Sequence, residues 1–256
     1  MNLFQNFQNC CMMNIQRSSY MQEPIIKGPI EYIKEAWKIY TKKENFIYFA
    51  KIMTVLTVLS ALITFLHDYL SKFVFDSQTG RFDFDNLVIV VSYIFISIIF
   101  FVFFFYQSST TYVALLNINS NIKDIFKSGF KNMGKVFLMM LALWILFLLG
   151  FLLFIIPGFI FMTWYIFAIY LVIDKKYGVN MALKESKVLV KGRFWKVFGR
   201  NLAFGLLTLL IGFITALIPQ VGSILSLFIA PLFMLPYYLL YRDLSAGSRL
   251  DDLRAA

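Results

Sequence analysis

Hydrophobic residues gather in six long runs, and short polar segments separate them. A helix needs about 20 apolar residues to cross the hydrocarbon core of a bilayer, and most of these runs approach or reach that length. The runs are Phe46–Leu66, Leu87–Tyr106, Val136–Ile156, Phe159–Ile173, Phe198–Ile218 and Ser223–Tyr241. The fourth is short, so we expect it either to include Pro157 and Gly158 in its first turn or to lie tilted and partly in the interface. The pattern predicts an all-α polytopic membrane protein with six transmembrane helices.

A basic amphipathic stretch precedes each pair of runs. In all three stretches apolar residues recur at helical spacing, and lysines cover the opposite face. The apolar stripes are Ile30, Ile33, Trp37 and Tyr40; Ile122, Ile125, Phe126 and Phe130; and Ala182, Leu183, Ser186, Leu189 and Val190. Asn180 is the expected N-cap of the third stretch. Such stretches are typical of helices that lie in the headgroup plane of a membrane.

The stretches and runs together form a repeat. Lys135 and Lys196, which precede the third and fifth runs, are 61 residues apart, and Pro157 and Pro219, at the following breaks, are 62 apart. The three copies span about 29–116, 119–176 and 178–244. We predict three hairpin repeats, each preceded by a basic interfacial helix, with tight outer turns at the two prolines. Their packing is either pseudo-symmetric around a centre or a compact bundle.

Composition supports a membrane protein. Hydrophobic residues make up 60% of the chain and charged residues 15%, whereas about 25% of residues are charged in soluble proteins. We predict one transmembrane domain over residues 25–245, a disordered N-terminal extension over 1–24 and a short cytoplasmic tail over 246–256. Six runs leave no room within these residues for a separate catalytic domain of ordinary size.

Lysine and arginine fall in alternate connections between the runs. They are dense before the first run, between the second and third, and between the fourth and fifth, whereas residues 67–86 carry two basic residues against four aspartates. Because cytoplasmic connections are enriched in Lys and Arg, we predict that both termini are cytoplasmic. The net charge of +10 lies beside apolar runs, which favours anionic lipid headgroups as partners over nucleic acid.

Few residues are suited to chemistry. The only histidine, His67, stands beside Asp68 at the outer end of the first run, where we expect it to be solvated. Charged residues and histidine are missing from the middle of every run, which argues against proton-coupled transport and intramembrane acid–base catalysis. Cys10 and Cys11 are adjacent and lack the spacing of a zinc site. We expect no enzymatic activity, no cofactor and no bound metal.

Three further patterns predict local structure. The segment 107–111, Gln-Ser-Ser-Thr-Thr, ends the second run, and we expect its hydroxyls to bond across helices. Phenylalanines alternate around a glycine over residues 73–84, which predicts a small β-hairpin lying on the membrane. Pro231 and Pro236, in the last run, are candidates for a kink that opens a cavity.

Several short motifs are unusual in combination. They are Ile156-Pro157-Gly158, Ala182-Leu183 with Ser186, Lys191-Gly192-Arg193-Phe194-Trp195, and Tyr241-Arg242-Asp243-Leu244. Over residues 25–245 the chain resembles the YciC-like family of bacterial inner-membrane proteins and the related membrane domain fused to glycerophosphoryl diester phosphodiesterases. The resemblance implies a six-span protein of the bacterial inner membrane whose activity is largely uncharacterised. It brings no catalytic residue, since the acids and histidines of those phosphodiesterases lie in a separate soluble domain.

We interpret the matching positions as structural. They are Pro157, Gly158, Ser186, Gly192, Phe194, Trp195, Pro219, Tyr241, Arg242 and Asp243. Gly192 is expected to permit a sharp turn into the fifth run, and Phe194 and Trp195 are expected to anchor at the membrane interface.

Two hypotheses for function follow. In the first, the chain organises lipids or partner proteins at the cytoplasmic leaflet through its basic helices, and the foremost contacts are Lys184, Lys187, Lys191 and Arg193. In the second, it is a transporter or channel for a small or lipid-like substrate and uses the last run, which contains two prolines. An alternative interpretation of the lysines is that they only anchor the fold and determine its orientation in the membrane.

Overall fold

The computed structural model describes residues 26–75, 86–153, 155–217 and 219–255, and within them the chain is almost entirely helical. The helices are α2 (Pro29–Thr41), α3 (Lys43–Val74), α4 (Leu87–Leu116), α5 (Ile122–Leu153), α6 (Ile155–Tyr165), α7 (Ala168–Asp174), α8 (Val179–Val190), α9 (Phe194–Ala216) and α10 (Pro219–Ala255). The predicted all-α class is confirmed. The N-terminal extension, with Cys10 and Cys11, lies outside the described residues.

Five helical segments are long and apolar enough to cross a membrane. They are Lys43–Val74, Leu87–Leu116, Ile122–Leu152, Ile156–Asp174 and Phe194–Thr215. They correspond to the first five predicted runs, so the structure is compatible with a multi-pass membrane protein. The sixth predicted run lies within α10, where side chains are described only for residues 228–246. Among the described residues there are thus five candidate spans, where the sequence predicts six.

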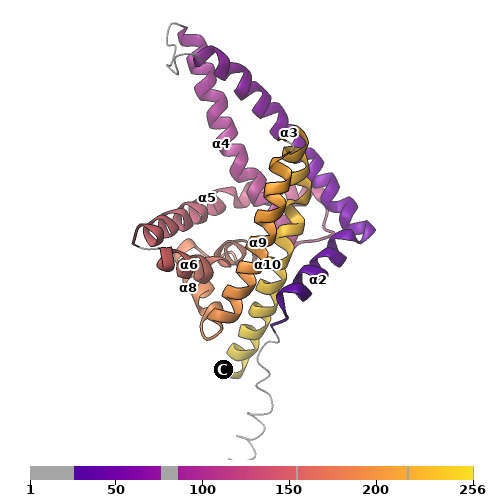
Figure 1. Cartoon of the computed structure of the whole chain (residues 1–256), viewed down its shortest axis with the longest axis vertical. Helices are drawn as coiled ribbons and strands as arrows, with labels where there is room; N and C mark the ends of the chain where they lie inside the picture. The colour runs from indigo at the N-terminus through magenta and orange to yellow at the C-terminus, as the bar shows by residue number, and fades with distance from the viewer. Residues whose placement is uncertain (1–25, 76–85, 154, 218, 256) are drawn as a thin grey trace, which may run out of the picture.

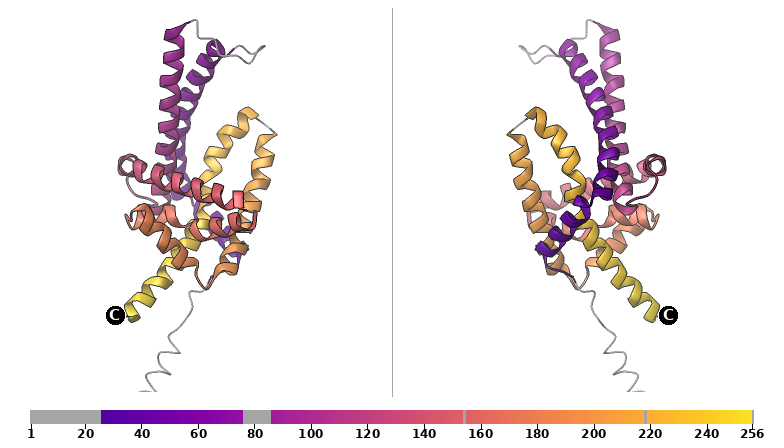
Figure 2. Two further views of the ribbon diagram at one scale, coloured as in Figure 1. Left: turned by 90° about the vertical axis from the view of Figure 1, so that its left-hand side faces the viewer. Right: turned by 90° about the vertical axis from the view of Figure 1, so that its right-hand side faces the viewer.

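Consecutive long helices pack as hairpins: α3 against α4, α5 against α6, and α9 against α10. The α3–α4 pair converges at the top of the molecule (Figure 1) and reaches beyond the tip of the α9–α10 pair (Figure 2). The α5–α6 pair lies across the direction of the other two in both figures. The α5–α6 pair therefore differs in direction from the other two pairs, and the threefold repeat remains a prediction.

Two of the three amphipathic stretches are separate helices. Helix α2 begins at Pro29, a favoured first helical residue, and the Glu31 carboxylate accepts a hydrogen bond from the Gly28 N–H at 3.1 Å. Helix α8 is also distinct, but its N-cap is Gly178 and not the predicted Asn180. The second stretch is continuous with the following span in α5, so the prediction of a separate interfacial helix there is wrong. Proline is absent between this stretch and the span, and Gly134 alone does not end a helix.

The prolines at the outer breaks lie in the first turns of helices. This confirms the expectation that the short fourth run includes Pro157 and Gly158 in its first turn, whereas the tight outer turns predicted at the two prolines are not formed by the prolines themselves. Pro157 and Gly158 fall in the first turn of α6, and Pro219 is the first residue of α10. Both positions suit proline, because the first turn of a helix does not need its N–H group. Phe73 belongs to α3, so the predicted β-hairpin does not begin there. The rest of that hairpin falls in residues 76–85, outside the described residues.

The buried core lies where α2, α7 and α10 meet the N-terminal half of α3 and the C-terminal end of α4. Every residue of α7 from Ala168 to Ile173 is buried. The Tyr170 ring stacks on Tyr241 of α10, with ring centroids 5.3 Å apart, and packs edge-on against Tyr112 of α4. This core fixes the position of α2 and α10 relative to each other, which matters for the site described next.

Candidate functional site

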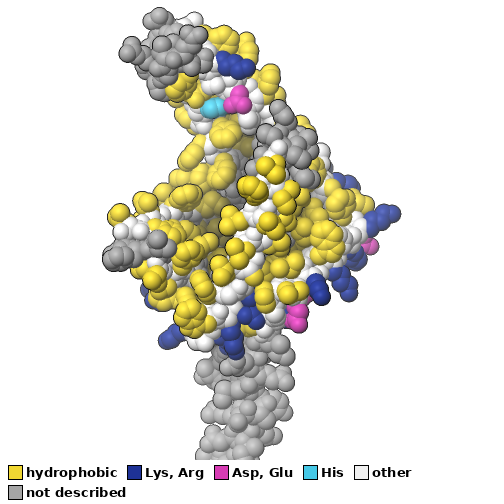
Figure 3. All heavy atoms as spheres, in the orientation of Figure 1, with side chains coloured by type: hydrophobic (Ala, Val, Ile, Leu, Met, Phe, Trp, Pro, Cys, Tyr) yellow, Lys and Arg dark blue, Asp and Glu magenta, His cyan; other side chains and the backbone are white. Residues whose placement is uncertain are grey.

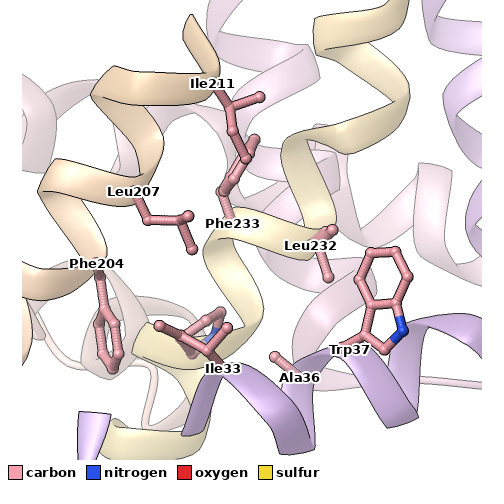
Figure 4. A pocket seen from close by; sticks show the side chains of 9 residues that line it. Ile33, Ala36, Trp37, Phe204, Leu207, Ile211, Leu232 and Phe233 are labelled. Atoms are coloured by element: carbon pink, nitrogen blue, oxygen red, sulfur yellow. The ribbon is translucent and has the colours of Figure 1, made fainter. Parts of the chain in front are cut away.

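An apolar recess lies between α2, α9 and α10 (Figure 4). Its volume is about 230 Å³. The lining residues are Ile33, Ala36, Trp37, Phe204, Leu207, Ile211, Leu232, Phe233 and Pro236. Among these side chains the indole nitrogen of Trp37 is the only polar atom. The recess therefore suits an apolar chain better than a hydrated solute.

Helical spacing in three separate helices builds this recess. The lining residues of α2 are spaced i, i+3 and i+4, and those of α9 are spaced i, i+3 and i+7, so each helix turns one face toward it. Pro231 and Pro236 are both buried inside α10, which continues past them, and Pro236 lines the recess. Because Pro236 has no N–H, the Leu232 carbonyl at the recess lacks its helical donor.

Trp37 marks the mouth of the recess. Its side chain is 59% exposed, more than that of any other lining residue. Lys34 and Lys38 are exposed beside it on α2. On the face shown in Figure 3, most lysine and arginine side chains gather along the lower edge, and hydrophobic side chains cover the surface above. An apolar cavity therefore opens close to a basic edge.

A network of polar side chains joins α2 to α10, and its α10 residues lie about two turns after Pro236 of the recess. The Glu35 carboxylate accepts hydrogen bonds from Lys27 Nζ at 2.6 Å and from an Arg242 guanidinium nitrogen at 3.2 Å. The Tyr32 hydroxyl donates to the Asp243 carboxylate at 3.0 Å. Residues separated by about 200 positions in the sequence thereby hold the two helices together.

The charges of this network are mutually stabilised. Burial alone would raise the pKa of Glu35, but hydrogen bonds from Lys27 and Arg242 outweigh burial and hold the pKa below its usual value. The hydrogen bond to Glu35 raises the pKa of Lys27. Burial, with the nearby charge of Asp243, raises the pKa of Tyr32. None of these shifts brings a pKa toward neutrality, so the network is a structural clamp and not an acid–base pair.

Two further contacts position the same helices. Arg200 of α9 donates from Nε to the Lys27 carbonyl at 2.7 Å, and its guanidinium also reaches the Ile26 carbonyl at 3.1 Å. The Tyr241 hydroxyl donates to Asp174 Oδ2 at 2.7 Å, which ties α10 to the end of α7. Tyr241, Arg242 and Asp243 thus make contacts that link α10 to α7 and α2.

The four predicted lipid-contact residues lie on a different part of the surface. Lys184, Lys187 and Lys191 are exposed on α8 or at its C-cap, and Arg193 is half-buried at the start of α9. The ammonium group of Lys187 lies 4.4 Å from the centre of the Trp164 ring, a cation–π contact. None of the four lines the recess. We call them the α8 basic surface.

The remaining motif residues make local contacts around α8. Gly192 has a φ angle of +78° between α8 and α9, where the sequence predicts a sharp turn, and this region favours glycine. The Ser186 hydroxyl donates to the Trp164 carbonyl at 2.7 Å and joins α8 to α6. Phe194 stacks on Phe198 one turn along α9. Trp195 is 78% exposed, as suits a residue at an interface.

Gly158 has a packing role that its predicted place in a turn does not explain. A Cβ atom at this position would lie 2.7 Å from the Phe151 ring of α5, so the glycine permits close approach of α5 and α6. Pro157 stands beside it in the same turn of α6.

His67 is predicted to be solvated, but its side chain is only 26% exposed. Its ring packs against Tyr93 and Phe100 of α4, with centroids 5.0 and 5.5 Å away. The long α3–α4 hairpin places these rings opposite it, which the sequence around His67 does not reveal. Nδ1 also lies 3.6 Å from the Asp68 carboxylate.

Sequence reasoning misses the recess and the Glu35 clamp. The lining faces of α2 and α9 are visible as apolar stripes, but their pairing across some 170 residues depends on tertiary packing. Pro236 is the one useful signal. Asn201 is also missed, although it is an amide inside an apolar run.

A scan against protein-family models finds no match to this chain, and searches of curated proteins and of solved structures find none either. The resemblance to YciC-like proteins therefore remains an expectation, and the function has to be inferred from the site.

Proposed function

We propose that this chain is a six-span protein of the bacterial inner membrane, built from three hairpin repeats with both termini in the cytoplasm, that organises anionic lipids at the cytoplasmic leaflet. Five long apolar helices and the gathering of lysine and arginine along one edge support this placement. The proposal assigns no catalytic step, cofactor or metal to the chain, and no nucleic-acid partner.

One observation carries the proposal: an apolar recess opens at Trp37 between the exposed cations Lys34 and Lys38. An acyl chain would occupy the recess, and its anionic headgroup would meet these lysines in the plane of α2. Each lysine near a membrane surface contributes about 1 kcal/mol to binding of anionic lipid. The α8 basic surface would hold further anionic headgroups without an acyl-chain cavity of its own.

The test measures lipid retention in nanodiscs that contain equal amounts of anionic phosphatidylglycerol and zwitterionic phosphatidylethanolamine. After transfer to mild detergent, the lipids that stay bound to the full chain are identified by native mass spectrometry. We expect Lys34→Gln with Lys38→Gln to weaken phosphatidylglycerol binding by roughly 30-fold, from about 2 kcal/mol of lost attraction. Replacing the four residues of the α8 basic surface by Gln should also reduce retention, with the helical content unchanged.

A matched pair of variants distinguishes lipid binding in the recess from lipid binding elsewhere on the surface of α9. Leu207→Phe combined with Ile211→Phe should fill the recess and abolish its bound lipid. Leu210→Phe adds the same ring on the same helix at a 60% exposed position outside the recess and should leave binding unchanged. Equal phosphatidylglycerol retention in the parent chain and both variants would refute the recess as the lipid site.

The alternative function is a transporter, and one observation restricts it. Pro236 does line a cavity, but that cavity is apolar, which favours a lipid-like substrate over a small polar one. Transbilayer movement of a fluorescent phospholipid in proteoliposomes distinguishes the two functions. The lipid-organising proposal predicts the same rate as in protein-free vesicles, and an accelerated rate that Leu207→Phe and Ile211→Phe suppress would favour transport.

A further inference from the structure

A second apolar pocket lies between α6 and α9, away from the recess. Its volume is about 160 Å³, and the residues that matter here are Phe159, Met162 and Thr163 of α6 and Asn201, Gly205 and Leu209 of α9. Phe159, Met162 and Leu209 are 41%, 42% and 71% exposed, so the pocket opens sideways on the outer surface of the helices. An apolar cavity of about this size is known to hold a benzene-sized molecule.

Asn201 is the unusual member of this pocket. Both polar atoms of its side-chain amide are buried, and neither has a hydrogen-bond partner among the described residues. The Thr163 hydroxyl donates to the Phe159 carbonyl of its own helix at 2.9 Å, so its proton is not directed to Asn201. An amide that is buried among apolar side chains without partners is costly, and more so in hydrocarbon, where water does not compensate.

The position of Asn201 along α9 determines how deep its amide would lie in the membrane. Trp195, exposed at the start of α9, is of the type that anchors at a membrane interface. Asn201 follows six residues later, about 9 Å further along the helix. If α9 spans the membrane, as in the proposed function, this amide lies among acyl chains and below the headgroups.

Gly205 keeps the pocket open. A Cβ atom built at this position meets no described atom within 4 Å, so close helix packing does not require the glycine. Alanine would meet no described atom through its Cβ there and would favour the helix by about 1 kcal/mol on intrinsic propensity. The glycine one turn after Asn201 therefore leaves space beside the amide.

We propose that this pocket binds an uncharged single-chain amphiphile whose hydroxyl group pairs with Asn201. A hydroxyl both donates and accepts a hydrogen bond, so it can bond to the Oδ1 and Nδ2 atoms of one amide. Lysine, arginine and histidine are not among the lining residues, which disfavours a phosphate or carboxylate head at this depth. The chain of the amphiphile leaves through the lateral opening into the bilayer.

The experiment uses photoreactive 1-hexadecanol with a diazirine near the hydroxyl, applied to the full chain in vesicles. The matched probe is the corresponding hexadecane, which lacks the hydroxyl, and labelled peptides are mapped by mass spectrometry. We expect labelling of α6 and α9 around Asn201 to be about three- to twenty-fold stronger for the alcohol, the range that one hydrogen bond within a membrane supplies. Equal labelling by both probes would overturn the proposal.

Three variants sharpen the result. Asn201→Leu should reduce alcohol labelling to the level of the hexadecane probe, and Gly205→Leu should remove labelling by both. Gly212→Leu is the control, because a Cβ atom there also meets no described atom within 4 Å and the position lies outside the pocket. Should Gly205→Leu fail to fold, the comparison of Asn201→Leu with the parent chain still decides the matter.

A second copy of the chain is the competing partner for Asn201. Crosslinks between two copies through α9 that Asn201→Leu abolishes would show that the amide pairs with a second chain, and would contradict the proposal. Failure of the alcohol site is also distinguishable from failure of the anionic-lipid function. Leu207→Phe with Ile211→Phe should leave alcohol labelling intact, since these residues line the other cavity.

Discussion

The two halves of α4 show opposite relations between residue type and burial. In α4, all of which the structure describes, the most apolar 18-residue window has a mean hydropathy of 3.0 and no buried residue. Leu87, Val88 and Phe95 are 72%, 75% and 64% exposed. At the other end the hydroxyl-bearing Ser109 and Thr110 are fully buried. The more polar half is thus inside, and the more apolar half is outside.

Close helix contact explains the buried half. The Ser109 hydroxyl donates to the Gly129 carbonyl of α5 at 2.8 Å, as the sequence predicts for this segment. Thr110 and Thr111 instead donate to carbonyls of α4 itself, four residues back. A Cβ atom at Gly129 would overlap the Thr110 hydroxyl, so the glycine lets the two helices touch. Small and hydroxylated residues at helix contacts are typical of membrane proteins.

The exposed, apolar half of α4 is more compatible with a hydrocarbon environment than with water. In water a surface with Leu87, Val88 and Phe95 so exposed would drive aggregation, whereas in hydrocarbon it is the stable arrangement. The comparison teaches that hydropathy alone does not predict burial. Close approach and hydrogen bonding decide which segments of α4 pack against other helices, and the most apolar segment stays exposed.

The largest expected effect comes from placing a charge on the exposed half. Phe95→Lys lies near the middle of the predicted second run and should make membrane insertion less favourable by about 2.5–3.5 kcal/mol. The fraction inserted is measured in a translation–insertion assay, with Phe95→Leu as the size control.

A second control uses another exposed residue, which lies outside the candidate spans. Val188→Lys on α8 starts from 55% exposure and should change insertion and folding by less than about 0.5 kcal/mol. If Phe95→Lys and Val188→Lys behave alike, the exposed half of α4 does not face hydrocarbon.

The next largest effect is expected at the contact between the buried half of α4 and α5. Gly129→Ala should destabilise the fold by about 1–3 kcal/mol, because the new methyl group overlaps Thr110 and its backbone. Gly134→Ala, on the same helix, meets no described atom within 4 Å and should be neutral or stabilising by up to about 1 kcal/mol. Thermal unfolding of the two variants in one detergent gives the difference, and an equal melting temperature would contradict the close contact.

The smallest expected effect concerns the ionic network of Glu35, Lys27 and Arg242, which joins α2 to α10. Because the pKa of Glu35 is below its usual value of 4.5 in the folded chain, the carboxylate stabilises the fold above pH 4.5. That contribution is lost as the pH falls through the lower, folded-state pKa. Lys27 acts in the opposite sense, since its raised pKa gives a contribution that is lost only at strongly alkaline pH.

Partly exposed ion pairs of this kind contribute up to about 1 kcal/mol. Glu35→Gln should lower the melting temperature slightly at pH 7 and remove part of the decline toward acid pH. Glu44→Gln is the control, since Glu44 pairs only with the exposed Lys42 among the described residues. Identical acid profiles for the parent chain and Glu35→Gln would show that the clamp does not stabilise the fold.

Much of the helical layout is predictable because it depends on local pattern. The positions of the apolar runs follow from hydropathy, and helices that begin near Pro157 and Pro219 follow from the missing N–H of proline. Local continuity is harder to predict. The amphipathic start of α5 joins its span because neither Gly134 nor its neighbours interrupt the helix.

The site is less predictable because it is tertiary. Glu35 and Arg242 are 207 residues apart, and neither has a local signal that selects the other. Positive charge draws attention to the α8 basic surface, but the recess lies beside α2, where Trp37 meets α9 and α10. The amide of Asn201, which has no hydrogen-bond partner among the described residues, is recognisable as unusual only because α6 brings apolar side chains next to it.

The most direct test of the central claim follows the fluorescence of Trp37 at the mouth of the recess. A chain with Trp144, Trp164 and Trp195 replaced by Phe is reconstituted with lipids brominated on their acyl chains. We predict stronger quenching by anionic than by zwitterionic brominated lipid at equal mole fraction, and loss of that difference in Lys34→Gln with Lys38→Gln. Equal quenching by both lipids in the chain that retains both lysines would contradict selective binding of anionic lipid at the recess.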